Sequence, residues 1–327
     1  MTASGEDGGR PALTVIVVSY RTKELTLAAL DALYRETRSL DMEVIVVDNA
    51  SDDGSADAIA ERFPRATLIR SEENLGFAAA NNLAAERARG ELLLLLNPDT
   101  EVRDRAVERV VEFARARPEA RIWGGRTVFA DGRLNPGSCW GAPTPWSTLC
   151  AALGFASKFG AVRWLNPEGL GSWPRDSERA VDIVSGCFLL IERSLWEELG
   201  GFDPAFFMYG EDADLCLRAR ARGARPRICP EATLVHHGGA SERVRADKMV
   251  RLFTAKARLF RRYWGRLAWV GVRELDLWAL VRVAGFAVVS LVSGRAREGR
   301  AQWSRVWKRR AEWRARDATG TTPPGPA

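Results

Sequence analysis

The sequence predicts an α/β protein built on a mainly parallel, twisted sheet of the Rossmann type, with helices on both faces. Up to Arg117, short apolar runs alternate with segments in which leucine or alanine recurs at helical spacing. The run Leu92–Leu96 is apolar without alternation, which is typical of a strand buried on both faces of a covered sheet. Polar residues directly follow several apolar runs, and open parallel sheets bind ligands at the carboxyl ends of their strands.

The expected strands and helices alternate along this part of the chain. The strands are short and rich in valine, isoleucine or leucine, and comprise Leu13–Ser19, Glu43–Val47, Thr67–Arg70 and Leu92–Leu96. Helical spacing or alanine content predicts the helices Lys23–Arg38, Ser55–Arg62, Gly76–Arg89 and Asp104–Arg117. Pro64 and Pro118 end the second and fourth helices, and Gly90 in a left-handed conformation is expected to close the third.

The pattern changes after Arg126. Residues 126–180 are rich in glycine, proline and tryptophan and show weak periodicity, which is typical of functional or disordered loops. Regular structure is expected to return with a strand, a helix and a last strand at Val181–Ile191, Glu211–Arg222 and Arg227–Val235. The last strand leads into His236 and His237, the only two histidines of the chain.

The C-terminal region from Glu242 onward is basic, helical and rich in tryptophan. Within it, Leu275–Ser293 is nearly apolar but slightly short for a membrane-spanning helix, and Arg282 lies near its middle. The flanking Arg, Lys and Trp residues suit a helix that lies in a membrane interface, and they are Arg262, Trp264, Trp269, Arg295, Arg297, Trp303, Trp307 and Lys308. The alternative is a helical hairpin packed on the core. Residues 1–11 and 317–327 are expected to be disordered.

Composition narrows the class of protein. The net charge of +6 and the pI near 9.3 favour an anionic partner such as nucleic acid, nucleotide phosphates or an acidic membrane surface. The five cysteines are odd in number and lack CxxC spacing, so they indicate reduced thiols and exclude a disulfide framework or zinc site. The first residues lack the apolar segment of a signal peptide, so we expect the folded part to stay in the cytoplasm.

Polar clusters at predicted strand ends are the candidate ligand site. They are Ser19 with Tyr20, Asp48, Asn97 with Asp99, and His236 with His237. Asp48 could accept hydrogen bonds from a nucleobase or ribose. Asp99 could hold a divalent cation, and an imidazole beside it would complete a site that bridges a diphosphate. The alternatives are a plain Asn-Pro-Asp turn and a solvated histidine pair.

Two helix starts add candidates. Asn74 and Gly76 precede the alanine-rich helix, where glycine allows close backbone approach and the helix start favours an anion. Glu211 and Asp212 open a later helix with more carboxylates than capping requires, so one of them could act as a general base. Ordinary turn and capping roles are the alternatives.

Taken together in this order, several segments resemble glycosyltransferase family 2, and most of all its bacterial rhamnosyltransferases. The segments are VIVVSYRTKE (15–24), VIVVDNASDDGS (44–55), NLGFAAANN (74–82), LLLLNPDT (93–100), VSGCFLLIERSLWEELGGFDPAFFMYGEDADLCLR (184–218) and VHHGGAS (235–241). The resemblance implies a GT-A domain over residues 12–241, with acceptor-side loops at 126–180, and leaves 242–316 as a membrane-associating helical extension.

The resemblance also implies roles for single residues. The family's DxD-type motif falls on Asn97-Pro98-Asp99, where Asn97 replaces the first carboxylate. Asp99 would hold Mg²⁺ or Mn²⁺ with His236, for which His237 is the substitute. Asp212 would be the base of an inverting transfer. Nucleotide-sugar contacts are expected from Ser19, Tyr20, Asp48, Asn74, Gly76, Asn97, Gly186 and Glu211.

The implied donor is dTDP-rhamnose, with UDP-sugars as the alternative, and the implied acceptor is a polyprenyl-diphosphate-linked saccharide at the inner face of the plasma membrane. Nucleic acid is not expected as a partner, and homo-oligomerisation stays open. A nucleotidyltransferase would need a Gly/Arg/Lys-rich loop after the first strand, and residues 19–22 (SYRT) are not one. A nonenzymatic membrane or nucleic-acid adaptor is the other alternative.

Overall fold

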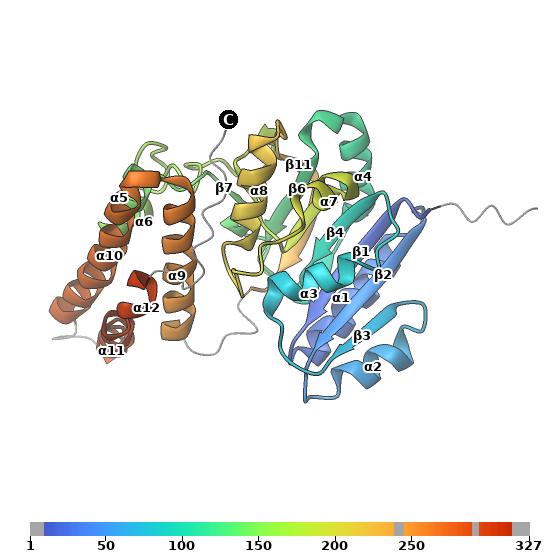
Figure 1. The fold of residues 1–327 in the computed structure, drawn as a ribbon, viewed down its shortest axis with the longest axis horizontal. Helices are drawn as coiled ribbons and strands as arrows, with labels where there is room; N and C mark the ends of the chain where they lie inside the picture. The colour runs from blue at the N-terminus through green and yellow to red at the C-terminus, as the bar shows by residue number, and fades with distance from the viewer. Residues whose placement is uncertain (1–9, 239–244, 290–293, 316–327) are drawn as a thin grey trace, which may run out of the picture.

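A computed structural model describes residues 10–238, 245–289 and 294–315 (Figure 1). The predictions of disorder at 1–11 and 317–327 therefore lie almost wholly outside the described residues, as does the end of the apolar segment 275–293.

The described strands form one large sheet and one small one. The large sheet has the order β3-β2-β1-β4-β10-β6-β11-β5, and β8 pairs with β11. The small sheet pairs β7 with β9. The strands are β1 (Leu13–Ser19), β2 (Met42–Asn49), β3 (Thr67–Ser71), β4 (Leu92–Leu96), β5 (Thr100–Val102), β6 (Ile122–Val128), β7 (Cys139–Trp140), β8 (Arg179–Ala180), β9 (Ile183–Val184), β10 (Phe188–Glu192) and β11 (Arg227–His236).

Strand directions bring the predicted polar clusters to one edge. Strands β3, β2, β1 and β4 are parallel, β10 is antiparallel to both β4 and β6, and β11 is parallel to β6. Strands β6 and β11 therefore run in the same direction as β4. The carboxyl ends of β1, β2, β4 and β11 meet at the same edge, and β10 begins there.

The prediction of one strand over Val181–Ile191 is wrong. The segment divides into β9 and β10, with residues 185–187 between them. The Ser185 amide bonds the Ser138 carbonyl, and the Gly186 amide turns to Asp212. The backbone thus leaves the sheet at a point where its N–H groups have partners elsewhere.

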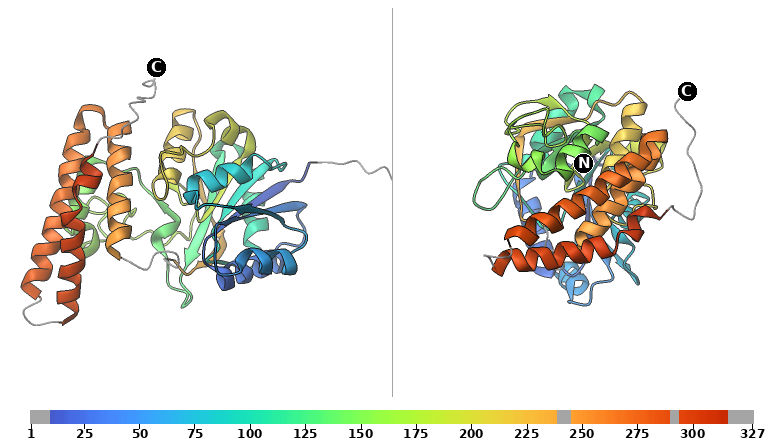
Figure 2. Two further views of the ribbon diagram at one scale, coloured as in Figure 1. Left: turned by 60° about the horizontal axis from the view of Figure 1, so that its bottom comes forward. Right: turned by 90° about the vertical axis from the view of Figure 1, so that its left-hand side faces the viewer.

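Helices cover both faces of the large sheet, as predicted. Leu93 and Leu95 belong to an apolar cluster with α3, α7 and α8, whereas Leu94 and Leu96 belong to one with α1 and α4 (Figures 1 and 2). Side chains alternate between the two faces of a strand, so both faces of the leucine run are buried. The helices of this part are α1 (Lys23–Glu36), α2 (Ser55–Arg62), α3 (Gly76–Ala85), α4 (Ala106–Ala116), α7 (Arg193–Leu199) and α8 (Glu211–Ala221).

Helix α3 ends at Ala85, four residues before its predicted end at Arg89. Gly90 does not adopt the expected left-handed conformation. It is instead a site of close approach, because a Cβ atom there would lie 2.4 Å from the backbone nitrogen of Thr14. The glycine is required by packing against β1 and does not cap the helix.

Residues 126–180 are more regular than predicted. They contain η2 (Pro136–Ser138), β7, α5 (Pro145–Ala152), α6 (Phe155–Lys158) and β8. Thr144 and Ser147 form a reciprocal capping box at the start of α5. Helix α5 packs against the C-terminal helix α10, so this segment joins the two parts of the chain.

The C-terminal helices have a core of their own. They are α9 (Arg245–Tyr263), η3 (Gly265–Leu267), α10 (Ala268–Val289), α11 (Gly294–Lys308) and α12 (Ala311–Arg314). Phe253, Trp303 and Trp313 pack together in this core, and Trp303 is only 6% exposed. Of the tryptophans expected at a membrane interface, Trp269 is exposed and Trp303 is not.

In the described part of the chain, no helix combines the length and the apolar character that crossing a bilayer requires. The alternative of a packed hairpin fits α10 and α11, which lie against each other (Figure 2). Contact of this region with a membrane stays a prediction.

Candidate active site

A cavity of about 720 Å³ opens at the carboxyl edge of the large sheet. Its walls come from the ends of β1, β4 and β11, the turn before β10, the first turn of α8, and α9. Ten of the predicted site residues line it, namely Tyr20, Asn74, Gly76, Asn97, Asp99, Gly186, Glu211, Asp212, His236 and His237. The structure thus brings together side chains from residue 20 to residue 237.

Asp99 and His236 face each other across two strand ends. The pairing of Thr100 on β5 with His236 on β11 sets them side by side, and the His237 amide donates to the Asp99 carbonyl. The His236 Nε2 atom lies 3.3 Å from Asp99 Oδ1, and both side chains are largely buried. The pair is therefore fixed by backbone register as well as by its own contact.

The charges of this pair stabilise each other. Burial opposes protonation of His236, but Asp99 and the nearby Cys187 thiol outweigh it and raise the imidazole pKa to about 10. Burial alone would raise the pKa of Asp99, yet its hydrogen bond to His236 holds that pKa below the usual value. His236 Nδ1 is buried and has no hydrogen-bond partner among the described residues.

A carboxylate oxygen and an imidazole nitrogen are donors that suit Mg²⁺ or Mn²⁺. Within residues 10–238, 245–289 and 294–315, no three His, Cys, Asp or Glu side chains gather in a metal-binding group. Asp99 and His236 therefore fit a cation only if substrate or water oxygens complete its coordination. A histidine ligand must be neutral, so cation binding would release the proton that His236 holds.

Glu211 and Asp212 lie in the first turn of α8, directly after Gly210 in a left-handed conformation. Asp212 Oδ2 accepts from the Gly186 amide at 3.1 Å, and Oδ1 accepts from the Ala213 amide at 2.8 Å. Glu211 Oε2 is buried and finds no partner in the described residues. Asp212 is thus held in place by the amides of two other residues, whereas Glu211 Oε2 has no such donor among the described residues.

Both carboxyls resist ionisation. Burial and the neighbouring Asp212 charge raise the pKa of Glu211 well above its ordinary value. Burial also raises the pKa of Asp212, but the amides of Gly186 and Ala213 stabilise its anion and limit the change. The two environments shift the pKa values of the two carboxyl groups by different amounts. Glu211 therefore keeps a proton more readily, and Asp212 carries the negative charge.

Gly186 leaves room for a neighbouring ring. A Cβ atom at this position would lie 3.0 Å from the Phe77 ring and 3.9 Å from Asp212 Cβ. The resemblance to the family places Gly186 among the nucleotide-sugar contacts. In the structure the Phe77 ring occupies part of the space beside Gly186, and Phe77 also lines the cavity.

The segment Asn74–Gly76 is held by a residue that sequence reasoning missed. The Asn49 side chain donates to Asn74 Oδ1 and to the Gly76 carbonyl, and it accepts from the Leu75 amide. Gly76 has a φ of +77°, and a Cβ atom there would lie 2.4 Å from the Phe207 carbonyl. Asn49 follows Asp48 directly, so its place at a strand end was the available signal.

Ser19 and Asp48 do not line the cavity, in contrast to the other predicted contacts. Ser19 is fully buried, and its hydroxyl bonds those of Thr26 at 2.8 Å and Thr22 at 3.5 Å. The structure thus gives Ser19 a role in docking α1 on β1 and no contact with the cavity. Asp48 is buried too, with Oδ2 accepting from the Ser51 amide, but its Oδ1 has no partner among the described residues.

Helix α9 closes one side of the cavity, which sequence reasoning also missed. It contributes Lys248, Leu252, Lys256 and Leu259 to the lining, and Lys256 pairs with Glu168 at 2.7 Å. The C-terminal region is therefore part of the site as well as an appendage to it. Its basic amphipathic pattern was visible in the sequence, but the surface it covers was not.

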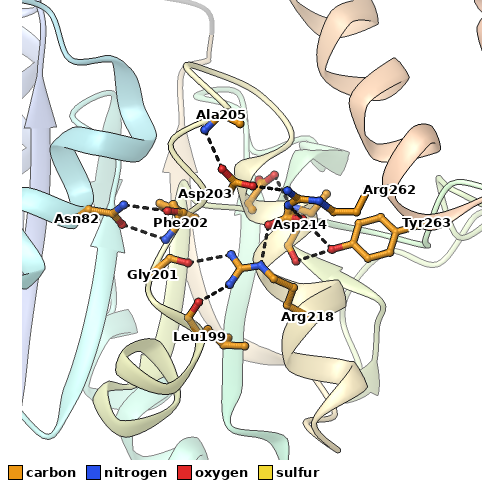
Figure 3. A network of polar contacts seen from close by, with 12 residues as sticks. Asn82, Leu199, Gly201, Phe202, Asp203, Ala205, Asp214, Arg218, Arg262 and Tyr263 are labelled. Carbon is orange, nitrogen blue, oxygen red and sulfur yellow. Dashed lines mark hydrogen bonds and ion pairs between the residues drawn. The ribbon is translucent and has the colours of Figure 1, made fainter. Parts of the chain in front are cut away.

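A buried polar network ties α9 to α8 (Figure 3). Asp214 is fully buried and accepts from Arg218 Nε at 2.7 Å, Arg262 Nη1 at 2.6 Å and the Tyr263 hydroxyl at 2.7 Å. Arg262 also pairs with Asp203, and Arg218 donates to two carbonyls of the turn before it. Because Asp214 is two residues from Asp212, the network anchors the helix turn that carries the carboxylates.

Comparisons with known proteins agree with this architecture. The family model described as "Glycosyl transferase family 2" matches residues 14–199, more than half of the chain. The structure of a mannosyltransferase from Pyrobaculum calidifontis, PcManGT, in complex with GDP-Man and Mn²⁺, aligns with a TM-score of 0.59 and 21% identity. That alignment covers 93% of this chain and 86% of the other, and it confirms the predicted GT-A fold.

Two relatives are similar in sequence. The O-antigen biosynthesis protein RfbC of Myxococcus xanthus is 32% identical over 245 residues, which is 73% of this chain but 18% of that protein. The N-acetylglucosaminyl-diphospho-decaprenol L-rhamnosyltransferase of Mycobacterium tuberculosis is 27% identical over 220 residues, or 60% of this chain and 66% of that protein. The expected likeness to rhamnosyltransferases is thereby confirmed, and the chain belongs to glycosyl transferase family 2.

Proposed function

We propose that this protein transfers a sugar, L-rhamnose from dTDP-rhamnose, to a polyprenyl-diphosphate-linked saccharide at the inner face of the plasma membrane. The observation that carries the proposal is the shared cavity, where the Asp99–His236 pair and the Asp212 carboxylate lie among residues of the sheet edge. This arrangement offers one place for a diphosphate and one base for an acceptor hydroxyl. The name of the mycobacterial relative supports both the rhamnosyl donor and the lipid-linked acceptor.

Asp212 is the base of a single displacement with inversion. Its carboxylate takes the proton of the acceptor hydroxyl while the hydroxyl oxygen bonds to the anomeric carbon and the bond to the diphosphate breaks. The raised pKa of Asp212 makes its anion a stronger base, and the Gly186 and Ala213 amides aim it. Glu211 retains its own proton, which keeps a second negative charge out of the site.

Asp99 and His236 face the diphosphate end of the donor. A divalent cation held by these two residues, Mg²⁺ or Mn²⁺, would supply positive charge against the leaving nucleoside diphosphate. The Mn²⁺ in the mannosyltransferase complex supports this assignment. Tyr20, Asn74 and Gly76 contact the nucleotide sugar from the β1 and α3 side of the cavity.

The experiment is a transfer assay with a panel of dTDP-rhamnose, UDP-sugars and GDP-mannose, on a polyprenyl-diphosphate-linked N-acetylglucosamine acceptor. We expect dTDP-rhamnose to be consumed, dTDP to be released and the product to show inverted anomeric configuration. Asp212→Asn should lower the rate about 10²- to 10⁴-fold with nucleotide binding intact. Asp57→Asn, which changes an exposed carboxylate that pairs with Arg70 and does not line the cavity, is the matched control.

Equal activity of the Asp212→Asn and Asp57→Asn proteins would remove Asp212 as the base. If a UDP-sugar is consumed in place of dTDP-rhamnose, the proposed sugar transfer stands and the proposed donor is wrong. Release of pyrophosphate would identify a nucleotidyltransferase, whereas no response to any nucleotide would favour the nonenzymatic adaptor.

A further inference from the structure

One surface of the protein combines exposed aromatic side chains with unpaired basic ones. It is formed by α5, α6 and the following turn, together with η3 and the start of α10 (Figures 1 and 2). We call it the aromatic–basic surface and define it by Trp146, Phe155, Lys158, Phe159, Arg163, Trp164, Arg266, Leu267 and Trp269. None of these residues lines the cavity.

The two segments of this surface are fixed to each other. Trp146 stacks on Trp164 with ring centroids 5.8 Å apart, and its indole N–H donates to the Trp164 carbonyl at 2.7 Å. Trp264, just before η3, donates to the Pro143 carbonyl at the start of the α5 segment. Helix α5 also packs on α10. The aromatic groups therefore stand on a rigid base although about a hundred residues separate them in sequence.

The aromatic exposure is unusually high for such large side chains. Trp164 is 63% exposed and Trp269 is 68% exposed, whereas Trp303 and Trp313 are buried in the core of the C-terminal helices and Trp264, Trp278 and Trp307 are partly buried against it. Contiguous exposed apolar groups on a folded protein mark an interaction surface. Tryptophan in particular favours the boundary between lipid headgroups and acyl chains.

The charge of this surface has one sign. Residues 142–167 and 263–273 contain no Asp or Glu. Within the part of the chain that the structure describes, Lys158, Arg163 and Arg266 form no ion pair and all three are exposed, and the Lys158 ammonium lies over the Phe159 ring. Like charges would oppose the docking of a second copy through the same surface. Trp146 and Trp164 stack on each other, so the ring faces between them are closed to a nucleobase.

We propose that the aromatic–basic surface docks on an anionic lipid bilayer, with its tryptophans in the headgroup region and its Lys and Arg side chains on lipid phosphates. The inference rests on the proposed lipid-linked acceptor, and it places the membrane on the side of the cavity where an acceptor would enter. Pro143, two residues before α5, lines the cavity, as do Trp140 and Gly141. The path from this surface to the site is therefore short.

The test is co-sedimentation of the full chain with vesicles of phosphatidylcholine alone, and with vesicles containing about one third phosphatidylglycerol. The wild-type protein should bind the anionic vesicles. The double variant Trp164→Ser/Trp269→Ser should bind them about tenfold more weakly. Its control, Leu280→Ser/Val288→Ser, removes exposed apolar groups further along α10 and should bind like wild type.

Charge is tested separately. The triple variant Lys158→Gln/Arg163→Gln/Arg266→Gln should bind anionic vesicles no better than neutral ones. The control for it neutralises three exposed arginines elsewhere, in the variant Arg65→Gln/Arg87→Gln/Arg115→Gln. Thermal melting of each protein verifies that it is folded.

Absence of wild-type binding to anionic vesicles would overturn the proposal, as would equal binding by the aromatic variant and its control. Loss of self-association or of RNA binding in the aromatic variant, with vesicle binding unchanged, would assign the surface to those partners instead. Thermal shift with dTDP and Mn²⁺ is measured on the same samples. A nucleotide response without vesicle binding refutes the docking surface alone, and vesicle binding without a nucleotide response refutes the proposed function alone.

Discussion

Replacing Arg262 by alanine should separate α9 from α8 and destabilise the protein. Arg262 is the only residue in Figure 3 that bridges two carboxylates, since it donates to Asp214 at 2.6 Å and also pairs with Asp203. The Arg262 side chain is 18% exposed, and that of Asp214 is fully buried. The contact is therefore made largely out of water, where losing one partner leaves a poorly solvated charge.

The expected loss of unfolding free energy is about 3 kcal/mol. A hydrogen bond to a charged group contributes about 1.5–3 kcal/mol, and Arg262→Ala removes such bonds to two carboxylates. The loss stays below the largest possible sum of these contributions because Asp214 keeps its bonds to Arg218 and Tyr263, while Asp203 is partly open to water. Arg262→Lys retains the charge but cannot reach both partners with a fork, so it should lose about half as much.

The assay is urea denaturation of the full chain, followed by circular dichroism and by tryptophan fluorescence. The matched control is Arg222→Ala, directly after the last residue of α8, because its partner Glu198 is as exposed as Arg222 itself. A surface pair of this kind contributes at most about 1 kcal/mol. If Arg262→Ala costs no more than Arg222→Ala, the network does not hold α9 to α8 and the reasoning fails.

Three further predictions concern the cavity. Glu211→Gln should unfold at higher urea than wild type at pH 7 and at the same urea near pH 4. Burial and Asp212 raise the pKa of Glu211 above 4.5 in the folded state, so the wild-type protein loses free energy of unfolding as the pH rises through that pKa, whereas the glutamine variant does not. A difference between the two proteins that stays constant across the pH range would contradict this. Gly76→Ala should cost about 2–4 kcal/mol because it meets both a left-handed backbone and a carbonyl at 2.4 Å. Gly132→Ala, with a φ of +82° and no atom nearby, should cost only the conformational part, and equal losses would refute the clash. Asp99→Asn should weaken Mn²⁺ binding at least about tenfold in a titration followed by electron paramagnetic resonance, and unchanged affinity would exclude it as a ligand.

Much of the sheet edge could be predicted because the signals are local. Five successive leucines report burial on both faces, and the proline after Asn97 ends the strand, so the place of Asp99 follows from its neighbours in sequence. The same local logic placed His236 at the end of β11. That these two residues touch depends on the pairing of β5 with β11, which the sequence does not encode in any short pattern.

Two side chains lie in surroundings that differ from the expected ones, and the reason is a different physical one. Ser19 ends a strand as predicted, but helix α1 docks with Thr22 and Thr26 over it, and their hydroxyls take up its hydrogen bonds. Trp303 lies among arginines in the sequence, as an interfacial tryptophan would. It is nevertheless a core residue, because long basic side chains can extend to water from positions beside a buried ring. Residue type alone does not distinguish these cases.

The reversal of β10 explains how the proposed base and the proposed diphosphate site come to share one cavity. Phe188 on β10 pairs with Leu96 on β4 in antiparallel register, and the Asn97 amide donates to the Cys187 carbonyl. The turn before β10 is therefore held beside the end of β4, which leads to Asp99. From that turn the Gly186 amide reaches Asp212. A parallel β10 would begin at the opposite edge and leave Asp212 without this donor, so the antiparallel insertion couples the two halves of the site.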